Sequence, residues 1–130
     1  MYGMCRAPCI RVIRPRDIEG RAFDLSVGMI RWAARKPAAG VDRDLVRQLV
    51  RAVTSMGANL EEARAAETKA DFVHKVSIAR KESLEAHYWA RLLLSQAEDS
   101  RLTDLSHEIN EIAAILTSIV RRGRESPQRG

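Results

Sequence analysis

The sequence predicts an all-α protein with one domain, an up-down-up-down antiparallel four-helix bundle. Apolar residues recur at alternating three- and four-residue spacing in four separate segments, as one face of a helix requires. Aromatic residues make up only 5% of the chain, whereas Ala, Leu, Arg and Glu abound, which favours helices packed through aliphatic side chains. The connections are about three to seven residues long, so consecutive helices should pack as antiparallel neighbours.

The chain begins with a basic leader, residues 1–16. It contains two prolines and no sustained periodicity, so we expect it to be extended or disordered. Cys5 and Cys9, the only cysteines of the chain, lie in this leader with no histidine or second cysteine pair nearby. We interpret them as two reduced thiols rather than as a disulfide or a metal site.

The bundle is predicted over residues 17–122, and its first helix begins near Asp17, an N-cap candidate. Its main apolar stripe consists of Ile18, Ala22, Leu25, Met29 and Trp32. Arg35 and Lys36 are followed by Pro37, which cannot continue a helix. The first helix should therefore end near residue 36.

Two long helices are predicted within residues 42–96, separated by a break at 65–68. Asp42 is the candidate cap of the first, which runs to about Ala65. Thr68 and Asp71 have capping-box spacing, so the second should run from about Lys69 to residue 96.

The apolar stripes of these two helices fit one antiparallel register. Folded back on each other, they place Ala63 opposite Phe72 at one end and Met56 opposite Ala79 in the middle. Many paired positions hold a small residue, which lets the backbones approach closely. The remaining predicted pairs are Asn59 with Val76, Ala52 with Ser83, Leu49 with Ala86 and Leu45 with Ala90.

The helix predicted over residues 69–96 has more apolar surface than one hairpin can bury. A second stripe contains Ile78, Glu82, Glu85, Trp89 and Leu92. A helix that is apolar on several sides is central in a bundle or lies at a subunit contact. Self-association would cover some of this surface.

The fourth helix should begin near Ser100 or Thr103 and end before Gly123, a suitable C-terminal glycine. Residues 123–130 are then expected to form a disordered basic tail. The apolar stripe of this helix consists of Leu105, Ile109, Ile112, Leu116 and Ile119.

The net charge of +5 comes from the two ends of the chain. The segment from Asp17 to Val120 contains 14 basic and 16 acidic residues, so the body carries about −2. Basic ends suit contact with phosphate backbones or an acidic partner, and solubilising disordered ends are the alternative interpretation. The candidate nucleic-acid-binding residues are Arg6, Arg11, Arg14, Arg16, Arg121, Arg122 and Arg124.

The sequence predicts a cytoplasmic protein without membrane contact. No apolar run approaches the roughly 20 residues that a membrane-spanning helix needs. The apolar patch at Ala7–Ile13 is interrupted by a proline and an arginine, which argues against a secretory signal.

We find no catalytic or metal-binding constellation, and predict a protein that is not an enzyme and has no cofactor. Glu82 with Glu85 and Glu108 with Glu111 resemble the carboxylates of di-metal bundles, but no histidine stands three residues after a glutamate. Gly-rich phosphate loops, nucleophile elbows and zinc-binding His pairs are absent from the sequence. The three histidines are expected on helix surfaces or flanks: His74, His87 and His107.

A polar stripe flanks the core row of the helix predicted over residues 42–65. It consists of Gln48, Arg51, Ser55, Asn59 and Glu62. If these groups are partly buried they need partners, because an unpaired buried polar group costs about 1–3 kcal/mol. One interpretation is a network that fixes helix register, with Glu82 and Glu85 paired to Lys81, Arg51 or Arg91; the other is a recognition surface.

The polar stripe and its surroundings resemble a known family. The run from Ala52 to Ala63, and then Asp71-Phe72, Ile78-Ala79 and Tyr88 to Leu93, are similar to four-helix bundle proteins encoded by intervening sequences in bacterial 23S ribosomal RNA genes. This family includes the accessory variability determinant of diversity-generating retroelements. The likeness covers about residues 17–120, and Lys81-Glu82 stands where many members have Gly-Ser. The polar motif of the family falls on Ser55, Asn59, Glu62, Lys81, Glu82 and Glu85.

The resemblance implies a non-catalytic protein that forms ring-shaped homopentamers. Retroelement members assist a reverse transcriptase, and bind it and nucleic acid through basic surface on the pentamer. This chain differs because its body is slightly acidic, which shifts the expected RNA or DNA contact towards the ends of the chain. Membership of the retroelement branch is left open by the residues.

The leading hypothesis is an oligomeric accessory protein that binds nucleic acid and assists a reverse transcriptase. The alternative is a protein-interaction scaffold without nucleic acid. A partner protein retained after nuclease treatment, with no bound RNA, would favour the scaffold.

Overall fold

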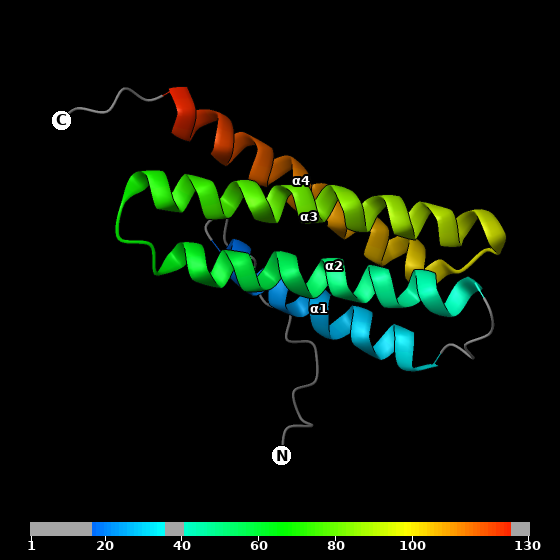
Figure 1. Cartoon of the computed structure of the whole chain (residues 1–130). Helices are drawn as coiled ribbons and strands as arrows, with labels where there is room; N and C mark the ends of the chain where they lie inside the picture. Colours follow the sequence, from blue (N-terminus) through cyan, green and yellow to red (C-terminus); the bar gives the residue numbers. More distant parts are fainter. Residues whose placement is uncertain (1–16, 36–40, 126–130) are drawn as a thin grey trace, which may run out of the picture.

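A computed structural model describes residues 17–35 and 41–125, which form four helices (Figure 1). They are α1 (Ile18–Arg35), α2 (Val41–Arg64), α3 (Lys69–Gln96) and α4 (Ser100–Glu125). Successive helices pack against each other, and α1 also packs against α4, which closes the bundle. The predicted all-α four-helix bundle with antiparallel neighbours is confirmed.

Two helices begin at the caps that the sequence predicts. The backbone N–H of Gly20 donates to Asp17 Oδ1 over 3.1 Å at the start of α1. The N–H of Asp71 donates to Thr68 Oγ1 over 3.0 Å at the start of α3. Each side chain satisfies a backbone donor that has no partner within its own helix.

The predicted caps of the other two helices are wrong. Asp42 lies inside α2 rather than before it. At α4 the cap is Asp99, whose Oδ1 accepts from the N–H of Leu102 over 3.0 Å. Thr103, an alternative cap in the prediction together with Ser100, instead donates its hydroxyl to the Asp99 carbonyl over 3.0 Å. Aspartate takes this position because its short carboxylate reaches the first-turn donors.

The core is built from the aliphatic stripes of all four helices. The predicted small positions of the central hairpin, including Ala52, Ala79 and Ala86, are fully buried. Ser83 is buried too and donates its hydroxyl to the carbonyl of Arg80 over 2.7 Å, which satisfies it locally. The apolar stripe of α3 is buried less completely at its N-terminal end than predicted. Phe72, which lies in the first turn of α3, is exposed.

Three polar contacts between α2 and α3 fall in antiparallel order along the hairpin. Lys75 Nζ lies 2.7 Å from Glu62 Oε1 near the connection, Ser55 Oγ lies 3.1 Å from Glu82 Oε2 further along, and Arg51 pairs with Glu85 beyond that. Each contact lies beside one of the predicted apolar pairs. The register of the hairpin therefore agrees with the one that the stripes predict.

The fourth helix continues to Glu125, so the predicted end at Gly123 is wrong. A Cβ placed on Gly123 would lie 2.5 Å from Val73 Cγ2. Valine is branched at Cβ and cannot easily turn this methyl group away. The glycine therefore serves the close approach of α4 to α3 rather than the end of the helix. The predicted leader, and residues 126–130 of the predicted tail, lie outside the described residues.

Candidate functional site

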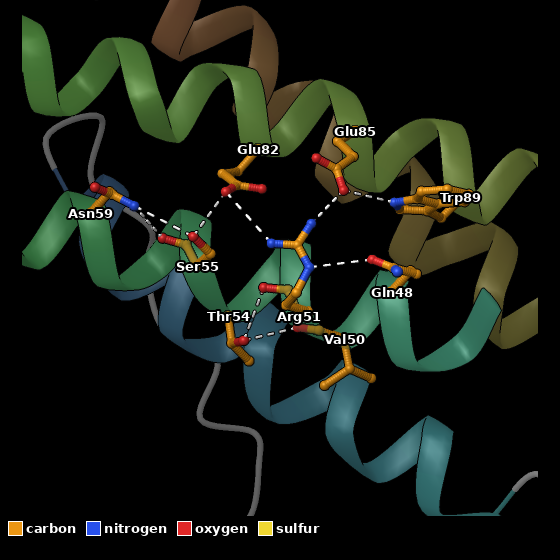
Figure 2. A network of polar contacts seen from close by, with 9 residues as sticks. All are labelled: Gln48, Val50, Arg51, Thr54, Ser55, Asn59, Glu82, Glu85 and Trp89. Carbon is orange, nitrogen blue, oxygen red and sulfur yellow. Dashed lines mark hydrogen bonds and ion pairs between the residues drawn. The ribbon is translucent and has the colours of Figure 1, made fainter. Parts of the chain in front are cut away.

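A polar network connects α2 to α3 on one side of the hairpin. Figure 2 shows Arg51 reaching from α2 towards two carboxylates of α3. Its Nη2 donates to Glu85 Oε2, and its Nη1 lies 3.8 Å from Glu82 Oε2. Its Nε donates to Gln48 Oε1 over 3.3 Å. One guanidinium therefore links both helices.

The remaining members of the network extend it in both directions along the hairpin (Figure 2). Ser55 Oγ donates to Glu82 Oε2 over 3.1 Å, and Asn59 Nδ2 donates to the Ser55 carbonyl over 2.9 Å. At the other end, Trp89 Nε1 donates to Glu85 Oε2 over 3.0 Å. Every polar residue of this chain of contacts has at least one partner on its own helix or the facing one.

The network is exposed at Arg51 and enclosed at Glu82. The Glu82 side chain is only 19% exposed, and its Oε1 is buried with no hydrogen-bond partner among the described residues. A carboxylate in this position depends on the nearby guanidinium, because a buried charge without compensation is strongly unfavourable. The geometry favours the interpretation of a structural network that fixes the register of α2 and α3.

The structure brings together four of the six residues that the resemblance assigns to a polar motif, Ser55, Asn59, Glu82 and Glu85. Glu62 lies nearer the α2–α3 connection and accepts a hydrogen bond from Lys75, which raises the pKa of Lys75. Lys81 is exposed on α3. These two side chains are available to solvent and are not needed to complete the network.

Sequence reasoning missed a second cluster, which connects α1 to α4. Arg21 donates from Nε to Glu108 Oε2 over 2.9 Å and from Nη2 to Glu108 Oε1 over 2.7 Å. The same Nη2 lies 2.9 Å from Glu111 Oε1. The Arg21 side chain is only 15% exposed. The hydrogen bond to Glu108, aided by the one to Glu111, raises the pKa of Arg21 and outweighs burial, which lowers it. Glu108 and Glu111, the Glu-x-x-Glu pair that resembles the carboxylates of a di-metal site, therefore bind an arginine side chain.

The three histidines lie on α3 and α4, and none of them is fully buried. His74 and His107 are exposed, and His87 is half-buried on α3. Burial, and then the positive charges of Arg91 and His107, lower the pKa of His87. Within residues 17–35 and 41–125, no three His, Cys, Asp or Glu side chains are grouped so that they could hold a metal ion.

Arginines gather at the C-terminal end of α4. Arg121, Arg122 and Arg124 are exposed on the last turns of this helix, so Arg124 belongs to the helix and not to a tail. Arg124 Nη2 donates to Ser77 Oγ of α3 over 3.4 Å. The other candidate arginines, Arg6, Arg11, Arg14 and Arg16, lie outside the described residues.

A fourth arginine joins this group from α3. Arg80 Nε donates to Thr117 Oγ1 over 2.9 Å. Thr117, Arg121 and Arg124 follow four-three spacing and share one face of α4, so Arg80 lies beside the same face. Between Glu111 and Glu125 the sequence of α4 contains no acidic residue. We call Arg80, Arg121, Arg122 and Arg124 the basic end of the bundle.

Comparisons with known proteins agree with the resemblance seen in the sequence. Residues 16–118 match the model of a protein family that is described as "23S rRNA-intervening sequence protein". A crystal structure of a protein with unknown function from the S23 ribosomal protein family of Bacteroides thetaiotaomicron VPI-5482 has a TM-score of 0.70 and 26% identity, and the match covers 80% of this chain and 98% of that chain. The search of curated proteins gave no match. None of the described helices is long and apolar enough to cross a membrane.

Proposed function

Because the chain belongs to the family of 23S rRNA-intervening sequence proteins, we propose that it is a non-catalytic, oligomeric accessory protein that binds nucleic acid. The observation that carries this proposal is the basic end of the bundle. Three exposed arginines stand in the last turns of α4, and Arg80 of α3 lies beside them. A group of exposed arginines on rigid helices suits the phosphate backbone of RNA or DNA.

The shape of the basic end favours contact with phosphates rather than with base edges. Arginines on two neighbouring helices can follow a backbone, and neutralising several phosphates releases counterions. The arginines of the leader, which precedes α1, would add to this contact. Affinity should then depend strongly on salt and weakly on sequence.

Replacing Arg121, Arg122 and Arg124 by glutamine should weaken nucleic-acid binding and lower its salt dependence. The plot of log K against log salt should lose about 0.9 in slope for each phosphate contact removed from a duplex. Gel-shift titrations of a structured RNA and a DNA duplex at several salt concentrations measure this slope.

The matched control changes Arg31, Arg35 and Arg43 to glutamine. These arginines are also exposed but lie near the end of α1 and the start of α2, away from the basic end. Both triple variants lower the net charge by the same amount. If the control loses as much affinity as the first variant, total charge and not the basic end determines binding. Absence of binding by the unmodified chain would leave the scaffold as the better proposal.

The exposed side of α3 supports the oligomeric part of the proposal. Leu84 and Tyr88 are about half-exposed there, and the ring of Tyr88 packs edge-on against Trp89 with 5.4 Å between ring centres. Apolar groups in this position suit contact with a second copy of the chain. By resemblance to the family, the assembly would be a homopentamer.

Replacing Leu84 and Tyr88 by glutamate should dissociate this oligomer. Each change places a charge in an apolar contact, while the half-exposed positions let the monomer fold. Sedimentation velocity of the unmodified and changed chains measures the mass of the assembly. An unchanged mass, with helical content retained, would show that subunits meet elsewhere.

A protein partner follows from the resemblance to retroelement accessory proteins. We propose a reverse transcriptase as that partner, with a scaffold that binds another protein as the alternative. Co-expression with a reverse transcriptase from the same genomic neighbourhood, followed by nuclease treatment and affinity purification, separates the two. If the transcriptase does not purify with the chain, either after nuclease treatment or with RNA present, the scaffold is the better proposal.

A further inference from the structure

A groove of about 260 Å³ lies between α1 and α2, at the end of the bundle where α1 begins. It is lined by Glu19, Phe23 and Ser26 of α1 and by Thr54, Gly57 and Glu61 of α2. A Cβ on Gly57 would find Ser26 Oγ at 3.5 Å and Ala22 O at 3.8 Å, which are ordinary contacts. The glycine therefore leaves room on the floor of the groove for one small group.

The rim of the groove carries an unusually exposed apolar side chain. Phe23 is 65% exposed, and Ile30, further along α1, is 50% exposed. They are seven residues apart and lie on the same outer face of the helix. Leaving a phenylalanine and an isoleucine in water is unfavourable, and an occupant of the groove would cover the phenylalanine.

The groove is also acidic. Glu19 and Glu61 stand on its two sides, and no basic residue of the described part of the chain forms an ion pair with either. Arg21, the nearest arginine in the sequence, is turned towards Glu108 on α4. An occupant should therefore combine apolar side chains with positive charge.

Such a segment is attached directly to α1. The leader ends at Arg16, next to the Asp17 cap, and its stretch from Cys9 to Arg14 reads CIRVIR. In it, each arginine follows a pair of apolar residues. From Cys9 to Asp17 the chain can extend about 26 Å at about 3.3 Å per residue. Since α1 rises only about 1.5 Å per residue, a leader that reverses direction before Asp17 reaches Phe23 with length to spare.

We propose that the leader, residues 1–16, folds back and docks in the groove between α1 and α2 of its own chain. Its apolar residues cover Phe23, and its arginines pair with Glu19 and Glu61. A tether of this length keeps the segment at a high local concentration, so modest contacts suffice. The proposal does not depend on nucleic-acid binding, although arginines held by the groove are withdrawn from phosphate.

Disulfide trapping in the full chain tests the docking. Cys5→Ser leaves Cys9 as the one native thiol, and Ala58→Cys adds a thiol on the exposed lining of the groove. Under mild oxidation we expect a bond between positions 9 and 58 within one chain, detected by peptide mass mapping. The matched control is Ala114→Cys, exposed on α4 at the height where Arg21 meets Glu111. Docking should make the bond to position 58 at least about tenfold faster than the bond to position 114.

Charge reversal separates docking from chance encounter. Glu19→Lys with Glu61→Lys should slow the bond to position 58 to the rate at position 114, whereas Glu98→Lys with Glu125→Lys should not. High salt should slow it in the same way without any change at the acidic residues. Helical content by circular dichroism confirms that each variant folds. The proposal would be overturned if the bonds to positions 58 and 114 formed at equal rates. It would also be overturned if charge reversal and salt left the rate at position 58 unchanged, or if the bonds formed between two chains.

Discussion

Replacing Ala86 by leucine is expected to lower the free energy of unfolding by about 1–3 kcal/mol. Ala86 is fully buried on the face of α3 that packs against α2, and its neighbours Ala79 and Ala90 are buried as completely. Three added carbon atoms have no space between two helices that approach through small residues. The helices must move apart or a core side chain must leave its preferred rotamer. Urea unfolding followed by circular dichroism measures the loss.

The control for this change is Ala114→Leu on α4. Ala114 is exposed, and alanine and leucine both favour helices, so the free energy of unfolding should change by less than about 0.5 kcal/mol. A comparable loss in both variants would mean that leucine acts through the helix itself. Full stability of the Ala86→Leu chain would show that α2 and α3 do not meet at this face.

The central hairpin could be predicted because its small and apolar residues repeat at a fixed spacing on both helices. Burial of Met56, Ala79 and Ala86 needs only that periodicity and the antiparallel connection. Details at the helix ends depend on contacts between distant segments and could not be predicted in this way. Gly123 looked like a helix end by residue type, and only its approach to Val73 explains why it is glycine.

Asp99 shows the same limit of sequence reasoning. Asp99 Oδ1 caps α4, while its Oδ2 accepts a hydrogen bond from the indole N–H of Trp32 over 2.9 Å. Aspartate is a preferred cap, so residue type could have indicated the first role. The second role joins residues 67 positions apart in the sequence and follows only from the fold.

The candidate site was predicted in part, for an equally physical reason. Ser55, Asn59, Glu82 and Glu85 lie on facing sides of one hairpin, so the register that predicts the core also brings them together. Arg51 was one of several possible partners of the carboxylates, and the choice among them depends on side-chain rotamers. The contact of Arg21 with Glu108 needs the packing of α1 on α4, which no local pattern in the sequence specifies.

Replacing Arg51 by alanine should lower the free energy of unfolding by about 1–2 kcal/mol. This loss lies between the contribution of an exposed ion pair and the cost of leaving a buried polar group without its partner. The guanidinium lies next to Glu82, with Nη1 3.8 Å from Oε2, while the buried Oε1 of Glu82 has no hydrogen-bond partner among the described residues. The matched control is Arg47→Ala, one turn earlier on α2. Arg47 pairs with Asp44 across 3.4 Å, but both side chains are largely exposed, so the expected change is below about 0.5 kcal/mol.

A second change at Glu82 distinguishes a structural network from a recognition surface. Glu82→Gln removes the carboxylate charge that Arg51→Ala leaves without compensation, and so the double variant should unfold at a higher urea concentration than Arg51→Ala alone. The rescue has a direct physical cause, because an amide is easier to bury than a carboxylate. If Arg51→Ala leaves stability unchanged but abolishes nucleic-acid or partner binding, the network is a recognition surface instead. If Arg51→Ala lowers stability and Glu82→Gln restores it while binding persists, the polar network holds α2 and α3 in register, and recognition belongs to the basic end of the bundle.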